Sequence, residues 1–166
     1  MIRPGSEEKL IKMKILSEKQ KEESKMKRIL LTAMMMFSVI VARNIDETTG
    51  WEFDQSTTQS FYMFANIAVD GVDVDSLDVV GAFKDGACIG FANANPTSVG
   101  GYTTLPLMGL DGPVFGLSTG EVPDEILLYD TSNGSTLSLD PATALPGWLN
   151  NEIYIIDGTS TANNAL

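Results

Sequence analysis

The sequence predicts an all-β domain, and three observations carry that prediction. Apolar runs of strand length alternate with turn-forming dipeptides from residue 51 onward. No segment after residue 42 shows the spacing of an amphipathic helix. In the segment 79–92, Asp85-Gly86 separates two apolar runs and suits a two-residue type I′ turn, because both residues tolerate positive φ.

The Asp85-Gly86 turn predicts a regular hairpin. A close approach of neighbouring groups is expected at its two mid-strand glycines. The expected register places Phe83 opposite Cys88, Ala82 opposite Ile89, Val80 opposite Phe91, and Gly81 opposite Gly90.

The other strands follow from similar short apolar runs. Turns are expected at Asp70-Gly71 and Asn133-Gly134, and Pro106 indicates a sheet edge or a bulge. The expected strands are 51–53, 61–69, 102–108, 125–130, 136–139 and 153–156. With the hairpin, about seven or eight short strands favour an antiparallel β-sandwich, immunoglobulin-like or jelly-roll, with a small barrel as the alternative.

The domain boundaries follow composition. Residues 51–157 are expected to form the β-sandwich domain, which is long enough to bury one core. The polar residues 43–50 are predicted to be a flexible lead. The small and polar residues 158–166 are predicted to be a tail or linker.

The segment 26–42 is predicted to be a signal peptide. Met26-Lys27-Arg28 precedes an apolar run that ends at Ala42, where we place cleavage. The run is shorter than the roughly 20 residues of a membrane span, so no stable span is expected after cleavage. A buried core helix is the alternative. The protein is therefore expected to be secreted or at the cell surface, preceded by an N-terminal signal helix.

Residues 1–25 form a charged N-terminal extension. It is rich in Lys and Glu and suits a solvated helix over residues 7–25. We interpret it as the product of an upstream start or as an unusually long basic region before the signal peptide.

Charge is divided unevenly along the chain. The whole protein has a formal net charge of −11, whereas residues 43–166 hold 17 acidic residues against Arg43 and Lys84, a net of −15. So acidic a body would repel nucleic acid and anionic membranes. The charge is compatible with divalent cations, with cationic partners, or simply with a solvated surface.

The residue types present argue against an enzyme. The chain has no histidine, which excludes Ser-His-Asp and Cys-His machinery and His-ligated zinc. The single cysteine, Cys88, cannot form an intrachain disulfide and is expected to be a small buried side chain. Paired carboxylates, as in glycoside hydrolysis, are the one catalytic arrangement left open.

An acidic cluster is the candidate metal site, with calcium as the expected ion. Loop carboxylates and backbone carbonyls supply the oxygen ligands that calcium prefers, although the spacing differs from that of an EF-hand. The alternative is an acidic turn whose carboxylates face water. The candidate ligands are Asp70, Asp73, Asp75 and Asp78.

Aromatic residues are the candidate ligand-binding positions. Trp148, Tyr102 and Tyr129 have side chains suited to stacking on carbohydrate, and core packing is the alternative for each. Trp148 stands next to Pro146-Gly147, where it would be either a plug over the core or an exposed contact.

Three segments carry a resemblance to a known type of module. They are Gln59-Ser60-Phe61-Tyr62, the run from Val79 to Gly90, and the run from Leu128 to Gly134. Over about residues 50–157 the chain resembles an uncharacterised module of secreted multidomain proteins from marine Gram-negative bacteria. The resemblance implies a β-sandwich without assigned activity and supplies no catalytic residues.

Together these observations predict a secreted, non-catalytic module for adhesion or assembly at the cell surface, with a protein or glycan partner. A carbohydrate-binding module, stabilised by calcium, is the first alternative. A carboxylate-based glycosidase is the second.

Overall fold

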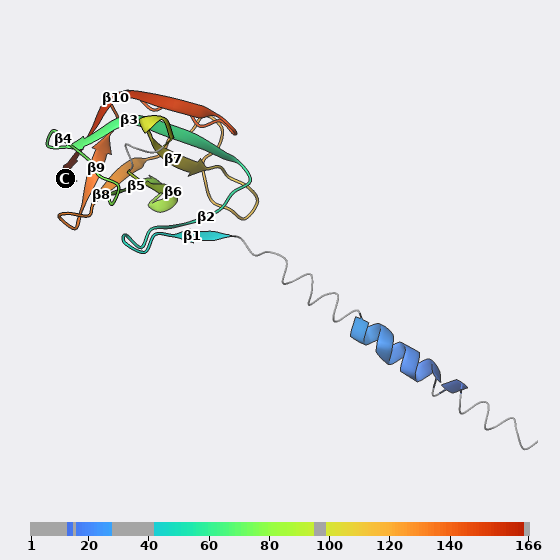
Figure 1. Cartoon of the computed structure of the whole chain (residues 1–166). Coiled ribbons are helices and arrows are strands. Elements are labelled where there is room, and N and C mark those ends of the chain that lie inside the picture. The colour runs from blue at the N-terminus through green and yellow to red at the C-terminus, as the bar shows by residue number, and fades with distance from the viewer. Residues whose placement is uncertain (1–12, 15, 28–41, 95–98, 165–166) are drawn as a thin grey trace, which may run out of the picture. The chain divides into compact units, whose positions relative to one another are not determined.

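The computed structural model describes residues 13–14, 16–27, 42–94 and 99–164 (Figure 1). The chain divides into two compact units, Met1–Ile40 and Val41–Leu166. In the first unit, residues 13–14 and 16–27 are helical and exposed, in agreement with the solvated helix expected there. Most of the predicted signal peptide, residues 28–41, lies outside the described residues. No helix in the described ranges is both long and apolar enough to cross a membrane.

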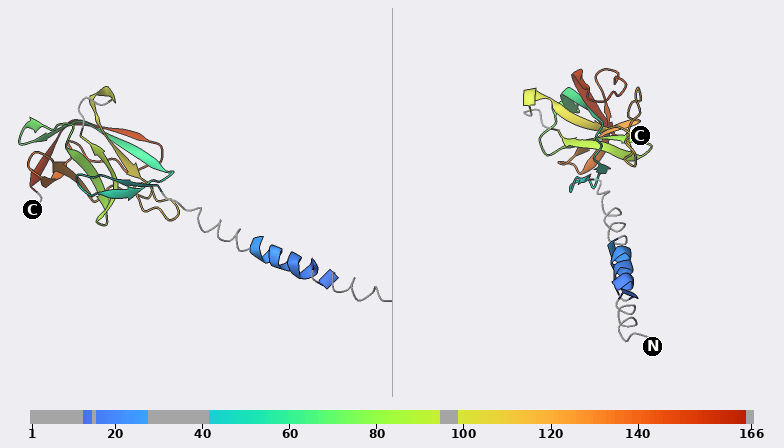
Figure 2. Two further views of the ribbon diagram at one scale, coloured as in Figure 1. Left: turned by 60° about the horizontal axis from the view of Figure 1, so that its bottom comes forward. Right: turned by 90° about the vertical axis from the view of Figure 1, so that its right-hand side faces the viewer.

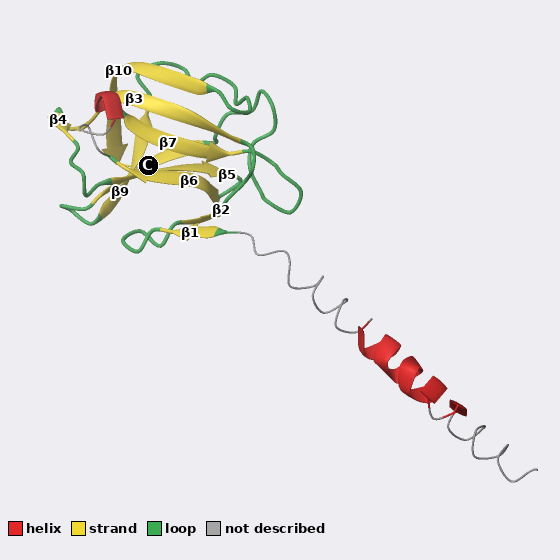
Figure 3. Cartoon of the chain, turned by 45° about the vertical axis from the view of Figure 1, so that its right-hand side comes forward, coloured by secondary structure: helices red, strands yellow, loops and turns green. Residues whose placement is uncertain are grey.

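Where the structure describes it, the second unit is all-β, as predicted, apart from a short 3₁₀ helix, η1, at Val99–Gly101 (Figure 3). The strands among the described residues of this unit are β1 (Arg43–Ile45), β2 (Glu52–Asp54), β3 (Gln59–Val69), β4 (Val72–Asp73), β5 (Val79–Lys84), β6 (Ala87–Asn93), β7 (Thr103–Met108), β8 (Glu125–Asp130), β9 (Ser135–Asp140) and β10 (Ile153–Asn164).

Eight of these strands form one curled sheet in the order β4-β3-β10-β9-β8-β5-β6, and β7 also pairs with β3 (Figure 2). β10 occupies one edge of β3 along most of its length. β7 and β4 therefore share the other edge, at Gln59–Phe64 and Ala68–Val69 respectively. The β10–β3 pair is parallel and the other pairs are antiparallel, so the sheet is mixed where an antiparallel one was predicted.

The β5–β6 hairpin confirms the predicted turn and corrects the predicted register. Asp85 and Gly86 have φ of 49° and 76°, and Phe83 lies opposite Cys88 as expected. Beyond that pair, Ile89 is an extra residue on β6, so Ala82 faces Gly90 rather than Ile89. Such a bulge shifts every later pair by one position. Val80 therefore faces Ala92 and Gly81 faces Phe91.

Both hairpin glycines lie at close approaches, as expected, although to other elements. A Cβ at Gly90 would overlap the backbone carbonyl of Pro106, because β6 passes directly against β7. A Cβ at Gly81 would lie 2.7 Å from the ring of Trp51. The Trp51 ring also meets Phe83 edge-on, which holds the β1–β2 sheet against the hairpin.

The segment 43–50, predicted to be a flexible lead, contains β1 and a turn into β2. The Asp46 carboxylate accepts hydrogen bonds from the Thr49 amide and hydroxyl, each at 2.7 Å. The Arg43 guanidinium pairs with Asp54 at 3.1 Å and with Glu52 at 3.2 Å. Local side-chain bonds and cross-strand charge thus order residues whose composition suggested a loop.

The segment from 158, predicted to be a tail or linker, instead continues β10 to Asn164. β10 shifts register between Ile156 and Thr159, where Gly158 takes a φ of 92°. The strand then adds antiparallel pairing with β9 to its parallel pairing with β3. Its small residues fit the interior, since Ser160 and Ala162 are buried.

The second unit has its own hydrophobic core. Every residue of the core cluster lies between Tyr62 and Ala162, and among the largest buried side chains are Phe64, Leu128 and Ile156. A chain of residues 43–166 therefore contains everything on which this core depends.

Candidate functional site

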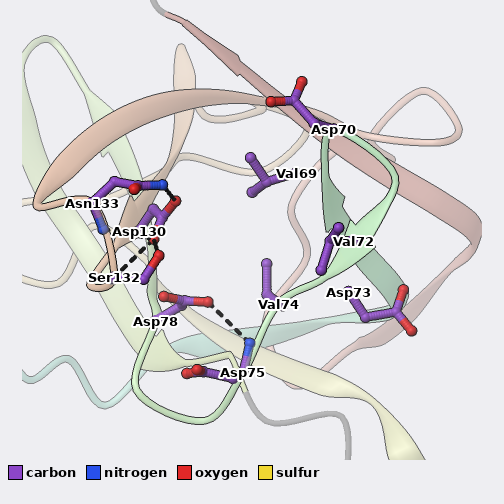
Figure 4. A pocket seen from close by; sticks show the side chains of 10 residues that line it. All are labelled: Val69, Asp70, Val72, Asp73, Val74, Asp75, Asp78, Asp130, Ser132 and Asn133. Atoms are coloured by element: carbon purple, nitrogen blue, oxygen red, sulfur yellow. Dashed lines mark hydrogen bonds between the residues drawn. The ribbon is translucent and has the colours of Figure 1, made fainter.

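The four predicted metal ligands line one open depression of about 340 Å³ at the β4 end of the sheet (Figure 4). It lies between the end of β3, the turn into β4, the loop that leads to β5, and the β8–β9 turn. Its lining residues are Val69, Asp70, Val72, Asp73, Val74, Asp75, Asp78, Asp130, Ser132 and Asn133. None of the lining residues is basic.

The depression is shaped by a tight turn and a short strand. Asp70 and Gly71 have φ of 51° and 82°, which confirms the predicted turn. β4 then pairs with Ala68 and Val69 of β3, and Val74 is buried beyond it. The chain therefore reverses direction at Asp70-Gly71 and runs back along β3, which leaves Asp70 and Asp73 near the rim of the depression.

Asp78 joins the loop to the β8–β9 turn. This residue is only 7% exposed, and its two carboxylate oxygens accept hydrogen bonds from the amides of Asp75 and Thr131, both at 2.9 Å. The Thr131 hydroxyl in turn donates to the Leu77 carbonyl at 2.7 Å. Asp78 thus connects two segments more than fifty residues apart in sequence and acts as a structural carboxylate.

Asp130 organises the β8–β9 turn and was missed as a site residue by sequence reasoning. Its carboxylate accepts hydrogen bonds from the Ser132 hydroxyl at 2.6 Å, the Asn133 side-chain amide at 2.6 Å and the Ser132 amide at 3.0 Å. The bond from the Ser132 hydroxyl is the main reason that the pKa of Asp130 lies below its usual value. The sequence signal for this turn is the run from Asp130 to Gly134, which reads Asp-Thr-Ser-Asn-Gly. Asp, Ser and Asn are typical of turns because their side chains form hydrogen bonds with the nearby backbone.

The predicted calcium ligands do not converge on a common point. The Asp75 carboxylate accepts from the Leu77 amide at 2.7 Å, and that of Asp73 from the Asn66 side chain at 2.9 Å. Figure 4 shows the side chains of Asp70 and Asp73 directed away from Asp78. Over the ranges that the structure describes, no group of three or more His, Cys, Asp or Glu residues is placed to hold a metal ion. Asp70, Asp73 and Asp75 are exposed, as the alternative of an acidic turn expects, whereas Asp78 is buried.

Trp148 is the plug over the core, the first of its two expected roles. It is only 4% exposed, its indole Nε1 donates to the Leu107 carbonyl at 3.1 Å, and its ring lies directly against Gly109. An indole in this position offers no face to a sugar ring. The expectation of an exposed Trp148 contact is therefore not met.

The other two aromatic candidates are half-buried and lie in different segments of the chain. Tyr102 lies between η1 and β7, and Tyr129 lies in β8, next to Asp130 of the depression. Tyr129 is therefore the one predicted aromatic residue adjacent in sequence to a residue that lines the depression.

A second, smaller hollow of about 140 Å³ contains Cys88 together with the Arg43 ion pairs. Cys88 is half-buried rather than fully buried, and burial raises the pKa of its thiol to about 11. A thiol with so high a pKa is a poor nucleophile at neutral pH. Lys84, the other basic residue of 43–166, pairs with Asp124 at 3.1 Å.

Comparisons of this chain with protein-family models, with curated proteins and with solved structures find no match. The resemblance to a secreted marine module stays a prediction that rests on the segments quoted above.

Proposed function

We propose that this protein is an exported, non-catalytic binding module, which serves adhesion or assembly at the cell surface by holding a basic partner surface in its acidic depression. The single observation that carries the proposal is the open depression, lined by five carboxylates and by no basic residue. Such a hollow concentrates negative potential and favours a ligand that brings lysine or arginine side chains.

The carboxylates of the depression are arranged for binding rather than for proton transfer. Asp130 accepts hydrogen bonds from the backbone amides of Ser132 and Asn133, which favour its charged form. A glycosidase needs one carboxylic acid with a raised pKa, whereas the pKa of Asp130 is lowered. These contacts support a fixed negative surface.

The β-sandwich architecture and the export of the protein are part of the same proposal. We infer that the curled sheet forms the two facing layers of a β-sandwich, immunoglobulin-like or jelly-roll, because β6 passes against β7 at Gly90. We also infer that the segment 26–42 directs export, from its basic start and apolar run.

The proposed binding role of the depression is tested by measuring the affinity of an oligolysine peptide for residues 43–166 by titration calorimetry. We expect binding that weakens as salt is added, and a loss of affinity of about threefold to tenfold in the Asp70→Asn/Asp73→Asn variant. The matched control is Glu47→Gln/Glu125→Gln, which removes the same charge at exposed positions outside the depression. Equal losses in the two variants would show that the peptide responds to net charge alone and would refute the site.

Export is tested separately by fractionation of cells that express the full chain. We expect the mature protein outside the cytoplasm, with an N-terminus at or within a few residues of Arg43. Recovery of the uncut chain from the cytoplasm would contradict the proposed location.

A further inference from the structure

The β8–β9 turn contains Asn133, the one asparagine in the sequence that is followed directly by glycine. Asn133 and Gly134 are both exposed, and Gly134 has a φ of 62°. Because glycine lacks a Cβ, its backbone nitrogen can approach a neighbouring group more closely than that of a bulkier residue. The turn therefore places a side-chain amide beside an unhindered backbone nitrogen, within reach of water.

These two neighbours can react with each other without an enzyme, because the reaction is intramolecular. The Gly134 nitrogen bonds to the side-chain carbonyl carbon of Asn133 and gives up its proton. The bond from that carbon to Nδ2 breaks, and the nitrogen leaves as ammonia. Water then opens the resulting five-membered imide, at one carbonyl to give aspartate and at the other to give isoaspartate. Asparagine is a thermolabile residue in proteins.

The Asp130 carboxylate holds Asn133 through two hydrogen bonds. Its Oδ2 accepts from the side-chain amide of Asn133 at 2.6 Å, and its Oδ1 accepts from the Asn133 backbone amide at 3.2 Å. The amide of Asn133 is accordingly directed toward Asp130 (Figure 4). The nitrogen that Asp130 binds is the one that leaves when the imide forms, so the reaction has to break this bond.

The negative charge of Asp130 opposes the same reaction. Attack by the Gly134 nitrogen places negative charge on the side-chain oxygen of Asn133, and a neighbouring carboxylate destabilises that charge. Asp130 is itself fixed in place, because it accepts hydrogen bonds from the hydroxyl and the backbone amide of Ser132, at 2.6 Å and 3.0 Å. Hydrogen bonding and charge thus act in the same direction.

We propose that Asn133 is a modification site, at which this protein deamidates through an imide with Gly134, and that the Asp130 carboxylate suppresses the reaction in the folded chain. Deamidation adds a carboxylate to the lining of the depression and removes an amide donor from Asp130. Isoaspartate also carries the backbone through its side chain, which lengthens the turn. The site does not depend on what the depression binds.

Peptide mapping by mass spectrometry tests the proposal on residues 43–166 kept at mildly alkaline pH. We expect Asn133 to convert about tenfold more slowly in the folded chain than in urea, the rate effect of one hydrogen bond to a charged group. The Asp130→Ala variant should lose most of this protection while folded. Ser132→Ala is the matched control and should react like the wild type, because it removes one hydrogen bond from the turn and keeps both bonds between Asn133 and Asp130. Circular dichroism spectra and melting curves establish that each protein is folded.

Three results would overturn the proposal. They are equal conversion rates of Asn133 in the folded and the unfolded wild type, no acceleration in the folded Asp130→Ala variant, and an equal acceleration in Ser132→Ala. The last result would show that any loosening of the turn exposes Asn133, so that Asp130 has no specific role.

Discussion

Trp148 connects the loop before β10 to β7 through one hydrogen bond, to Leu107, and through the contact of its ring with Gly109. The phenol oxygens of buried Tyr62 and half-buried Tyr154 reinforce the same loop, because Tyr154 donates to the Gly147 carbonyl at 2.9 Å and Tyr62 donates to the Pro146 carbonyl. At the scale of single residues, aromatic side chains thus close this end of the core.

Replacing Trp148 should therefore cost stability rather than binding. We expect Trp148→Ala to lower the free energy of unfolding of residues 43–166 by about 3–5 kcal/mol, from lost burial and the cavity left behind. Urea unfolding measures the loss. The neighbouring Leu149 is 44% exposed, so Leu149→Ala should cost less than about 1 kcal/mol. Similar losses in the two variants would contradict the buried position of the indole.

Asp130 makes stability depend on acid pH. Hydrogen bonds in the folded state lower its pKa, so the stabilisation is complete above the unfolded value of about 3.9. It is lost as pH falls through the lower pKa of the folded state. We expect the stability difference between wild type and Asp130→Ala to be largest near neutral pH and to shrink below about pH 4.

Ser132→Ala supplies the matching test, because the Ser132 hydroxyl is the main cause of the lowered pKa. It should reduce the same pH-dependent part of the stability while leaving the carboxylate in place. Chemical denaturation at a series of pH values measures both variants. A difference that stays constant from neutral to acid pH would show that Asp130 acts only through packing.

At the scale of elements, β10 lies inside the curled sheet and joins β3 to β9. Its first half pairs with β3 alone, and its second half pairs with β3 and with β9. The register shift after Ile156 lets one strand take part in both regions. The contribution of β10 therefore depends on the residues beyond Asp157.

Truncation tests that dependence. A chain that ends at Asp157 loses all pairing between β10 and β9 and leaves both β3 and β9 with an open edge, so we expect no cooperative thermal transition. A chain that ends at Asn164 keeps the whole strand and should melt like the full second unit. Circular dichroism at increasing temperature distinguishes the two. A normal transition in the shorter chain would restore the interpretation of 158–166 as a tail.

At the scale of the whole molecule, charge dominates. Residues 43–166 have a net charge of −15, so their acidic side chains repel one another in the folded state. Added salt screens this repulsion and should therefore raise the melting temperature. Acidity of this kind is general and does not require a bound ion. The aspartates of the depression fit this description, because their described hydrogen bonds come from backbone amides, amide side chains and the Ser132 hydroxyl.

Calcium should consequently act only as a screening ion. We expect residues 43–166 to show equal melting temperatures in millimolar calcium and in the same concentration of magnesium, each compared with EDTA at matched ionic strength. A site specific for calcium would instead add stability that grows with the logarithm of the calcium concentration. A larger shift in calcium alone, lost in Asp75→Asn, would reinstate the predicted metal site.

The sequence by itself determined the local features of this protein. Apolar runs placed most of the strands, because a strand with one buried face needs little more than alternating side chains. Asp85-Gly86 and Asp70-Gly71 placed two turns, because few other residues accept their positive φ. Composition also determined the acidic surface and excluded histidine chemistry.

The tertiary structure alone decided how these local features combine. The close approach of Gly90 to Pro106 depends on β7, which begins ten positions after the last residue of β6. The burial of Trp148 and the parallel pairing of β10 with β3 join residues about 40 to 90 positions apart. The depression likewise combines the loop before β5 with the β8–β9 turn. Local patterns carry no information on such partners, because contacts distant in sequence are selected by how the whole core packs.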